Sequence, residues 1–372
     1  QAPAEEGVEG PQGLGSSAAR GQAAEGWKMQ LRTRVWDALE AADAVLFPRP
    51  CHHRIPNCEG SPAACRRLLE LPEVRDAAVV KVHPSIGAAA LRTALVMMGK
   101  TVLVPPYPGA DFLYLELHRR LVPGIDALVR AGDKREYLRW ARPLALEEIP
   151  PVDAVVVATC VVAPNGARLG KGKGYGEVEW AILTELGVVD PDSTPVLTLC
   201  HDLQVVDSGS LPVEFLEDHD LPVDVAATPS RLLRCTPRRT KPSGVRWQLV
   251  DRQLEEDIGA LRALRALDAA SLARCREAAR VRRRQRGQGD AGGETQGEGW
   301  AEIVASCVER FSAEEGRLRE QGGAEARQDP TSTGGRAGHA AARSGAASGR
   351  RGKGKGKGQR TGSAGQWRKG RK

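Results

Sequence analysis

The stretch NGARLGKGKGYGEVEW, residues 165–180, places five glycines around Arg168, Lys171 and Lys173. Glycine has no Cβ, so backbone N–H groups in such a stretch can turn toward an anion and approach it closely. A helix predicted to begin near Gly176 would point its amino-terminal N–H groups and positive dipole end at the same place. The pattern favours a phosphate-binding loop, and a flexible basic turn in solvent is the alternative.

Two carboxylates, Glu177 and Glu179, follow these glycines directly. Magnesium prefers carboxylate and phosphate oxygens, so these side chains could hold the cation that accompanies a bound phosphate. The stretch is neither a Walker A motif nor a dinucleotide fingerprint, because its glycines alternate with single residues. The residues alone therefore leave the identity of the phosphate-bearing ligand open.

Short apolar runs that alternate with helical patterns must position this loop. Strands are expected at residues 77–82, 152–162 and 194–200, with amphipathic helices between them. Continuous apolar strands separated by helices predict a three-layer α/β fold, with a mainly parallel sheet covered by helices on both faces. Ligands of such sheets bind beyond the carboxyl ends of the strands, which is where the glycine loop is expected.

A helix is predicted to begin at Trp27, where apolar residues recur every four positions as far as Leu39. Lys28 and Arg32 share a different face of this helix. The pattern therefore predicts a packed helix that presents two cations side by side.

The chain is predicted to have four parts. Residues 1–26 and 287–372 are low in apolar periodicity and are expected to be disordered, the second part as a low-complexity basic tail. A folded domain is expected at 27–251, followed by a charged helix at 252–286.

The positive net charge of this 372-residue chain comes from its last residues. Residues 341–372 contain eleven Lys/Arg and no Asp/Glu, and removing them from the formal charge of +7 leaves −4 for the remainder. Lysines and arginines spaced by glycine can neutralise phosphates without a fixed conformation. The tail is therefore predicted to bind RNA, with a solubilising extension that has no partner as the alternative.

The eight cysteines form no C-x-x-C pair, a pattern typical of reduced intracellular thiols. No run approaches the roughly 20 apolar residues that span a bilayer. We therefore expect a soluble, cytoplasmic protein that does not contact membranes. A chloroplast or mitochondrial location is the alternative, because the chain begins at Gln1 and a targeting segment could precede it.

The segment CHHRIPNC invites a zinc hypothesis for Cys51, His52, His53 and Cys58. Adjacent histidines point apart in an extended chain, and no partner C-x-x-C exists, so a hydrogen-bonded structural loop is favoured over a zinc site.

His201 and Asp202 follow the strand expected at 194–200, at the end where ligands bind. Without a G-x-S-x-G motif, a hydrolase triad is not expected. Asp202 is predicted either to orient a ligand or the metal shell, or to complete a structural turn at the strand end.

The segments ARLGKGKGYGEVEW, FPRPCHHRIPN, STPVLTLCHDLQVVD and HDLPVDVAATPSRLL, in this order, resemble the 5-formyltetrahydrofolate cyclo-ligase family, also called 5,10-methenyltetrahydrofolate synthetases. The resemblance covers residues 27–251 and is strongest to a divergent branch found in animals and plants. It implies that Lys28 and Arg32 contact the phosphates of ATP and that Glu177 and Asp220 bind Mg²⁺. The loop residues that it assigns to ATP are Arg168, Gly170, Lys171, Gly172, Lys173, Gly174 and Tyr175. It places His53 or Arg54 near the substrate.

The resemblance implies an ATP-dependent ring closure that converts 5-formyltetrahydrofolate to 5,10-methenyltetrahydrofolate, or a related reaction on another small molecule. Two departures bear on this prediction: Gly176 replaces a second aromatic residue, and residues 85–89 offer no acid to hold the pterin. The alternative is a catalytically inactive homologue that binds nucleotide or folate and contacts RNA through its basic tail. The sequence leaves the oligomeric state open.

Overall fold

The computed structural model describes residues 17–213, 216–288 and 299–328. Its centre is an eight-stranded sheet. Across the sheet the order is β10 (Leu232–Arg234), β9 (Val225–Ala227), β8 (Val196–Leu199), β5 (Ala154–Val157), β1 (Val79–Val82), β2 (Thr101–Val104), β3 (Tyr114–Leu117) and β4 (Arg142–Leu144). The five strands from β9 to β2 run parallel, and the flanking β10, β3 and β4 are antiparallel to their neighbours. The prediction of a mainly parallel sheet is confirmed.

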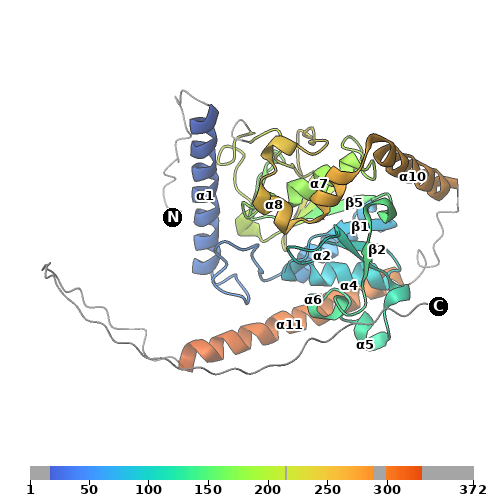
Figure 1. Ribbon diagram of the computed structural model, residues 1–372. Helices are drawn as coiled ribbons and strands as arrows, with labels where there is room; N and C mark the ends of the chain where they lie inside the picture. Colours follow the sequence, from blue (N-terminus) through green and yellow to red (C-terminus); the bar gives the residue numbers. More distant parts are fainter. Residues whose placement is uncertain (1–16, 214–215, 289–298, 329–372) are drawn as a thin grey trace, which may run out of the picture. The chain divides into compact units, whose positions relative to one another are not determined.

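Helices cover both faces of this sheet (Figure 1). One face is covered by α2 (Ser61–Leu69), α4 (Ala89–Met97) and α11 (Trp300–Gln328), and the other by α7 (Tyr175–Glu185), α9 (Ala260–Ala266) and α10 (Ala269–Gln288). Short helices α3 (Pro72–Arg75), α5 (Ile125–Leu128) and α6 (Lys134–Tyr137) lie in the connections. Successive strand residues point to opposite faces, so Val79 packs in one layer and Val80 in the other. The predicted three-layer fold is confirmed.

A third apolar cluster joins α1 (Ser17–Ala41) to a two-stranded ribbon of β6 (Val161–Val162) and β7 (Arg168–Leu169). The predicted apolar face of α1, from Trp27 to Leu39, is buried there. The helix begins ten residues before the predicted start, so residues 17–26 are helical, in contrast to the expected disorder. Alanine has the highest helix propensity, and the alanines in this stretch extend a helix that is already anchored by packing.

The segment after residue 251 differs from the single charged helix predicted at 252–286. It forms α8 (Arg252–Asp257), α9 and α10, with Asp251 and Asp268 accepting hydrogen bonds from the first-turn N–H groups of Leu254 and Ser271. Each aspartate caps and so starts a new helix. Because α9 also buries apolar side chains in the core, the compact part of the chain extends beyond the predicted domain.

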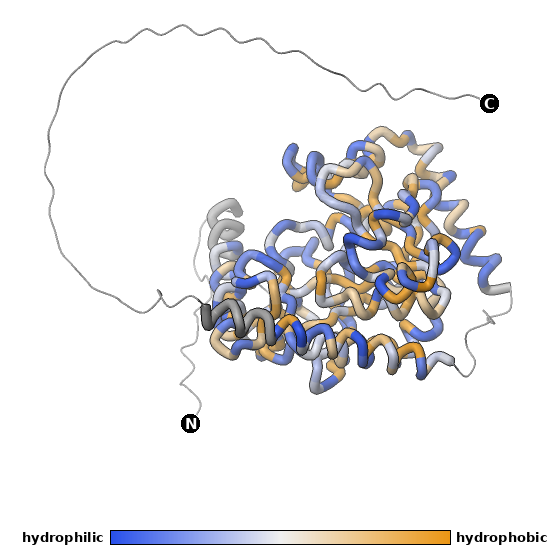
Figure 2. Tube along the Cα trace, turned by 90° about the horizontal axis from the view of Figure 1, so that it is seen from below, coloured by the Kyte–Doolittle hydropathy of each residue, from blue (hydrophilic) through white to orange (hydrophobic). Residues whose placement is uncertain are grey.

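Helix α11 lies within the part predicted to be a low-complexity tail. Its hydropathy alternates along the helix (Figure 2), and Val304 and Cys307 are buried against the face formed by α2 and α4. An amphipathic helix of this kind gains its stability from such packing. The basic tail at 341–372 lies outside the described residues.

Among the described helices, none is both long enough and apolar enough to cross a lipid bilayer.

Candidate functional site

A cavity of about 400 Å³ lies beyond the carboxyl ends of the parallel strands β1, β2 and β5. Residues that directly follow these strands line it, including His83, Pro105 and Ala158. The glycine loop at 168–177 and the segment around Asp220 complete the wall. This is the position at which sheets of this class bind ligands, and the volume is in the range of small-molecule sites.

The glycine loop connects β7 to α7 and opens the amino terminus of that helix to the cavity. Gly172 and Gly174 have φ angles of 85° and 66°, a left-handed backbone that glycine adopts without strain. Lys171 and Lys173 are exposed on this loop. Gly174 is the N-cap residue of α7 and provides no side chain to cap its first-turn N–H groups. The helix end therefore presents donors and a positive dipole to an anion.

Lys28 and Arg32 of α1 reach the same cavity, although their side chains are almost completely buried. Lys28 Nζ donates to Asp220 Oδ2 at 2.7 Å, and Arg32 Nε donates to the carbonyl of Gly170 at 2.8 Å. Three segments that are far apart in the sequence thus converge: α1, the glycine loop and the turn that carries Asp220.

Arg168 has a different position from the one that the sequence implied. Its guanidinium is buried, donates to the carbonyls of Leu221 and Ala158, and forms an ion pair with Glu177. Burial lowers its pKa to about 10. Arg168 therefore positions both predicted metal-binding segments, because it holds the Glu177 side chain and the backbone next to Asp220.

Glu177 and Asp220 both line the cavity, and each carboxylate is held by a buried cation. Asp220 also accepts the backbone N–H of Glu217 at 2.8 Å. Their oxygens are the donor type that Mg²⁺ prefers, so these residues fit a magnesium ion bound next to phosphate. Such an ion would compete with Lys28 and Arg168 for the same oxygens.

A buried ion pair in the cavity wall was not predicted from the sequence. Lys81 on β1 contacts Glu179 on α7, with 2.5 Å between Nζ and Oε2, and the two side chains are 2% and 10% exposed. The sequence had suggested Glu179 as a magnesium ligand, whereas the structure pairs it with a lysine. A single lysine in the apolar run AAVVKV was the available signal, because a lysine in a buried strand requires a partner.

His83 is the second unpredicted cavity residue. It follows β1, is 4% exposed, and its ring nitrogens have no hydrogen-bond partner in the described part of the chain. Burial, with Arg92 and Lys81 nearby, lowers the pKa of its imidazole well below 6.5. The ring is therefore neutral at physiological pH and offers one donor and one acceptor.

Three candidate residues do not line the cavity. His53 packs against Trp36 with ring centroids 5.4 Å apart, and Arg54 is exposed, whereas their neighbour Ile55 does reach the cavity. Asp202 accepts hydrogen bonds from the hydroxyls of Thr228 at 2.6 Å and Ser230 at 2.5 Å. Asp202 thus has the geometry of the structural turn that the sequence left as an alternative.

The fold and the cavity define a three-layer α/β protein with a charged ligand site at the carboxyl ends of its parallel strands. The profile of the 5-formyltetrahydrofolate cyclo-ligase family matches residues 24–229, more than half of the chain. The chain belongs to this family.

Named relatives are animal proteins called methenyltetrahydrofolate synthase domain-containing protein. The human protein is 35% identical over 243 residues, covering 64% of this chain and 61% of the relative, and the mouse protein is 36% identical over 242 residues, covering 64% and 63%. The match therefore spans less than two thirds of the relatives' own length. A solved structure, *Aquifex aeolicus* 5,10-methenyltetrahydrofolate synthetase, is similar at a TM-score of 0.37 and 20% identity, covering 58% of this chain and 96% of that one.

Proposed function

We propose that this protein binds Mg·ATP in the cavity and acts as an ATP-dependent cyclo-ligase on a folate-like substrate. The reaction would convert 5-formyltetrahydrofolate to 5,10-methenyltetrahydrofolate or close a ring on a related small molecule. The observation that supports this most directly is that Lys28, Arg32, Asp220 and the glycine loop line one cavity beyond the strand ends.

The charges around the cavity suit an anion that arrives with a cation. Seven Lys/Arg and six Asp/Glu line it, so the wall is nearly neutral overall. In this proposal the triphosphate contacts Lys171, Lys173 and the N–H groups of the loop, with Lys28 and Arg32 beneath. Glu177 and Asp220 would hold Mg²⁺, which neutralises phosphate charge when bound.

The proposed chemistry places most of the work on positioning and charge. The γ-phosphoryl group of ATP is transferred to the formyl oxygen, N10 of the folate attacks the activated carbon, and phosphate leaves, giving ADP, phosphate and the methenyl product. Cations that are fixed before the reaction stabilise developing charge without reorganising. The hydrogen bonds that hold Lys28 and Arg32 provide this order.

One observation favours a second candidate, which is binding without turnover. Ser85 lines the cavity, but residues 85–89 offer no carboxylate to hold a pterin. A protein that retains the phosphate half of the site and lacks the pterin contact would bind nucleotide without closing the ring. RNA binding by residues 341–372 stays a prediction, because the tail lies outside the described residues.

A turnover assay with a parallel binding measurement separates the candidates. Purified protein, 5-formyltetrahydrofolate and Mg·ATP are expected to give the methenyl absorbance band, with ADP released in equal amount. A control with excess chelator should abolish both signals. ATP binding by calorimetry without product would favour the second candidate, and failure to bind ATP would overturn both.

A further inference from the structure

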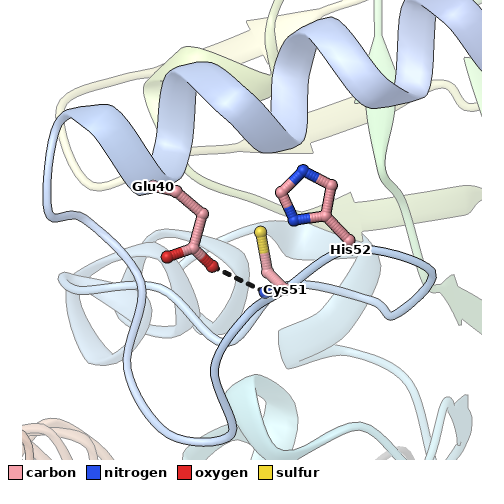
Figure 3. A group of neighbouring side chains, drawn as sticks. All are labelled: Glu40, Cys51 and His52. Carbon is pink, nitrogen blue, oxygen red and sulfur yellow. Dashed lines mark hydrogen bonds between the residues drawn. The ribbon is translucent and has the colours of Figure 1, made fainter. Parts of the chain in front are cut away.

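A cluster of three potential metal ligands lies outside the residues that line the cavity. Glu40, in the last turn of α1, faces Cys51 and His52 of the following loop (Figure 3). One ligand atom from each residue lies within 4.8 Å of the other two. A carboxylate, a thiol and an imidazole that converge in this way form a donor set typical of transition-metal sites.

A second carboxylate orients the imidazole. His52 Nε2 is 2.8 Å from Asp37 Oδ1, one helical turn before Glu40. The other ring nitrogen, Nδ1, points toward Cys51 and Glu40 (Figure 3). A carboxylate on the outer ring nitrogen keeps the proton there and leaves the inner nitrogen's lone pair available, the arrangement that usually supports metal-binding histidines.

The charge around the cluster also suits a divalent cation. Asp37 contacts His52, and the carboxylates of Glu40 and Asp43 share one cation, Arg49. Three acids and one base leave two negative charges, which a divalent ion would neutralise.

The donor types select the metal. Magnesium and calcium take oxygen ligands, whereas zinc combines sulfur, nitrogen and carboxylate oxygen in tetrahedral sites. Zinc–donor distances of about 2.0–2.3 Å require the three ligand atoms to move together by about 1 Å. The Cys51 thiol donates weakly to the carbonyl of Trp36 at 3.8 Å, a contact that metal binding would replace.

We propose that Glu40, Cys51 and His52 bind one Zn²⁺ ion, with water in the fourth position. None of the three lines the cavity, so the role is structural: the ion ties the carboxyl-terminal turn of α1 to the loop that follows. The zinc set considered from the sequence lacked Glu40 and included His53, whose ring packs on Trp36.

Metal content and cobalt spectroscopy of the full-length protein test this site. Chelator-treated protein is titrated with Zn²⁺, and with Co²⁺, whose bond to a thiolate gives a charge-transfer band in the near ultraviolet. We expect one ion per chain and a band that is lost in Cys51→Ala. Cys58→Ala, which removes a second buried cysteine of the same segment, and His53→Ala should keep both. Asp37→Asn should weaken zinc binding by about 10-fold through the orientation of His52.

His52→Ala keeps the test decisive if Cys51→Ala does not fold, because the His52 side chain is partly exposed. Circular dichroism reports whether each variant is folded. Binding of zinc below one equivalent, or binding that is unchanged in folded Cys51→Ala or His52→Ala, would overturn the site. Neither measurement uses nucleotide, so the outcome is independent of the proposed function.

Discussion

Two sets of cations line the cavity, and they differ in burial and in partners. The framework cations, Lys28, Arg32, Lys81 and Arg168, are buried, and each is held by a carboxylate or a carbonyl. The loop cations, Lys171 and Lys173, are exposed on the glycine loop. The difference indicates a division of roles in which the first set maintains the shape of the site and the second supplies affinity for an anion.

The physical basis of this division is the cost of leaving a charge unpaired. Removing one partner of a buried ion pair leaves the other charge in a poorly solvated place, which destabilises the fold strongly. An exposed lysine is solvated with or without a ligand, so its removal leaves no such charge behind. The two sets should therefore respond to mutation in different measurements.

The largest effect is expected for Lys81→Met, which leaves the Glu179 carboxylate buried without its partner. The free energy of unfolding should fall by about 3–5 kcal/mol, as is typical when one member of a buried pair is removed. Urea denaturation followed by circular dichroism measures this change.

The double variant Lys81→Met/Glu179→Leu is the control, because it removes both charges and keeps similar side-chain volumes. It should recover most of the lost stability. Equal losses in the single and double variants would show that packing, and not the ion pair, makes Lys81 part of the framework set.

Lys173→Ala tests the loop cations. Loss of a charge-assisted contact should weaken ATP binding by about 1.5–3 kcal/mol, while the free energy of unfolding changes by no more than about 0.5 kcal/mol. Calorimetric titration with Mg·ATP measures the affinity. Arg66→Ala on α2 removes the same charge from an exposed side chain that does not line the cavity. If both variants lose affinity equally, net charge explains the binding and the loop assignment is wrong.

A smaller effect is expected when the loop backbone itself is strained. Gly172 has φ of 85°, and a Cβ there would lie 3.3 Å from Arg32 Nη1. Gly172→Ala should cost about 1–2 kcal/mol of stability, because a side chain disfavours the left-handed backbone. Gly176→Ala is a control of opposite sign, since this glycine lies inside α7 with open space around it and alanine should stabilise the helix. Thermal denaturation of both variants distinguishes backbone strain from a general effect of adding a methyl group.

The sequence predicted the cation sets unequally, for a physical reason. Glycine spacing and strand runs are local patterns, so the loop, its position after a strand and the three-layer sheet were all predictable. The partners of buried charges are not local: Glu179 meets Lys81 from 98 positions away, and the Arg168 guanidinium contacts the carbonyl of Leu221. Family resemblance located Asp220 but could not show that Lys28 holds it.

The extent of the folded part was predicted less well than its centre. Charge and low complexity suggested a solvated helix and tail after residue 251, because composition averages over the few apolar residues that decide packing. In α11 those residues include Val304 and Cys307, which are buried against the sheet's helical layer. Spacing on one face, which a composition argument ignores, sets this outcome.

Glu315 gives the smallest expected effect and tests whether every buried charge of this protein depends on a cation. This glutamate of α11 accepts the backbone N–H of Gly60 at 3.1 Å, and burial raises its pKa to about 7 from 4.5. Between these two values the folded state keeps a proton that the unfolded state has lost, so stability should fall as pH rises from about 4.5 to about 7. Glu315→Gln should flatten this part of the curve of unfolding free energy against pH, whereas Glu314→Gln, at the adjacent position, should not. An unchanged slope in Glu315→Gln would show that the carboxyl is ionised in the folded protein, and that α11 docks with its charge paired as the framework cations are.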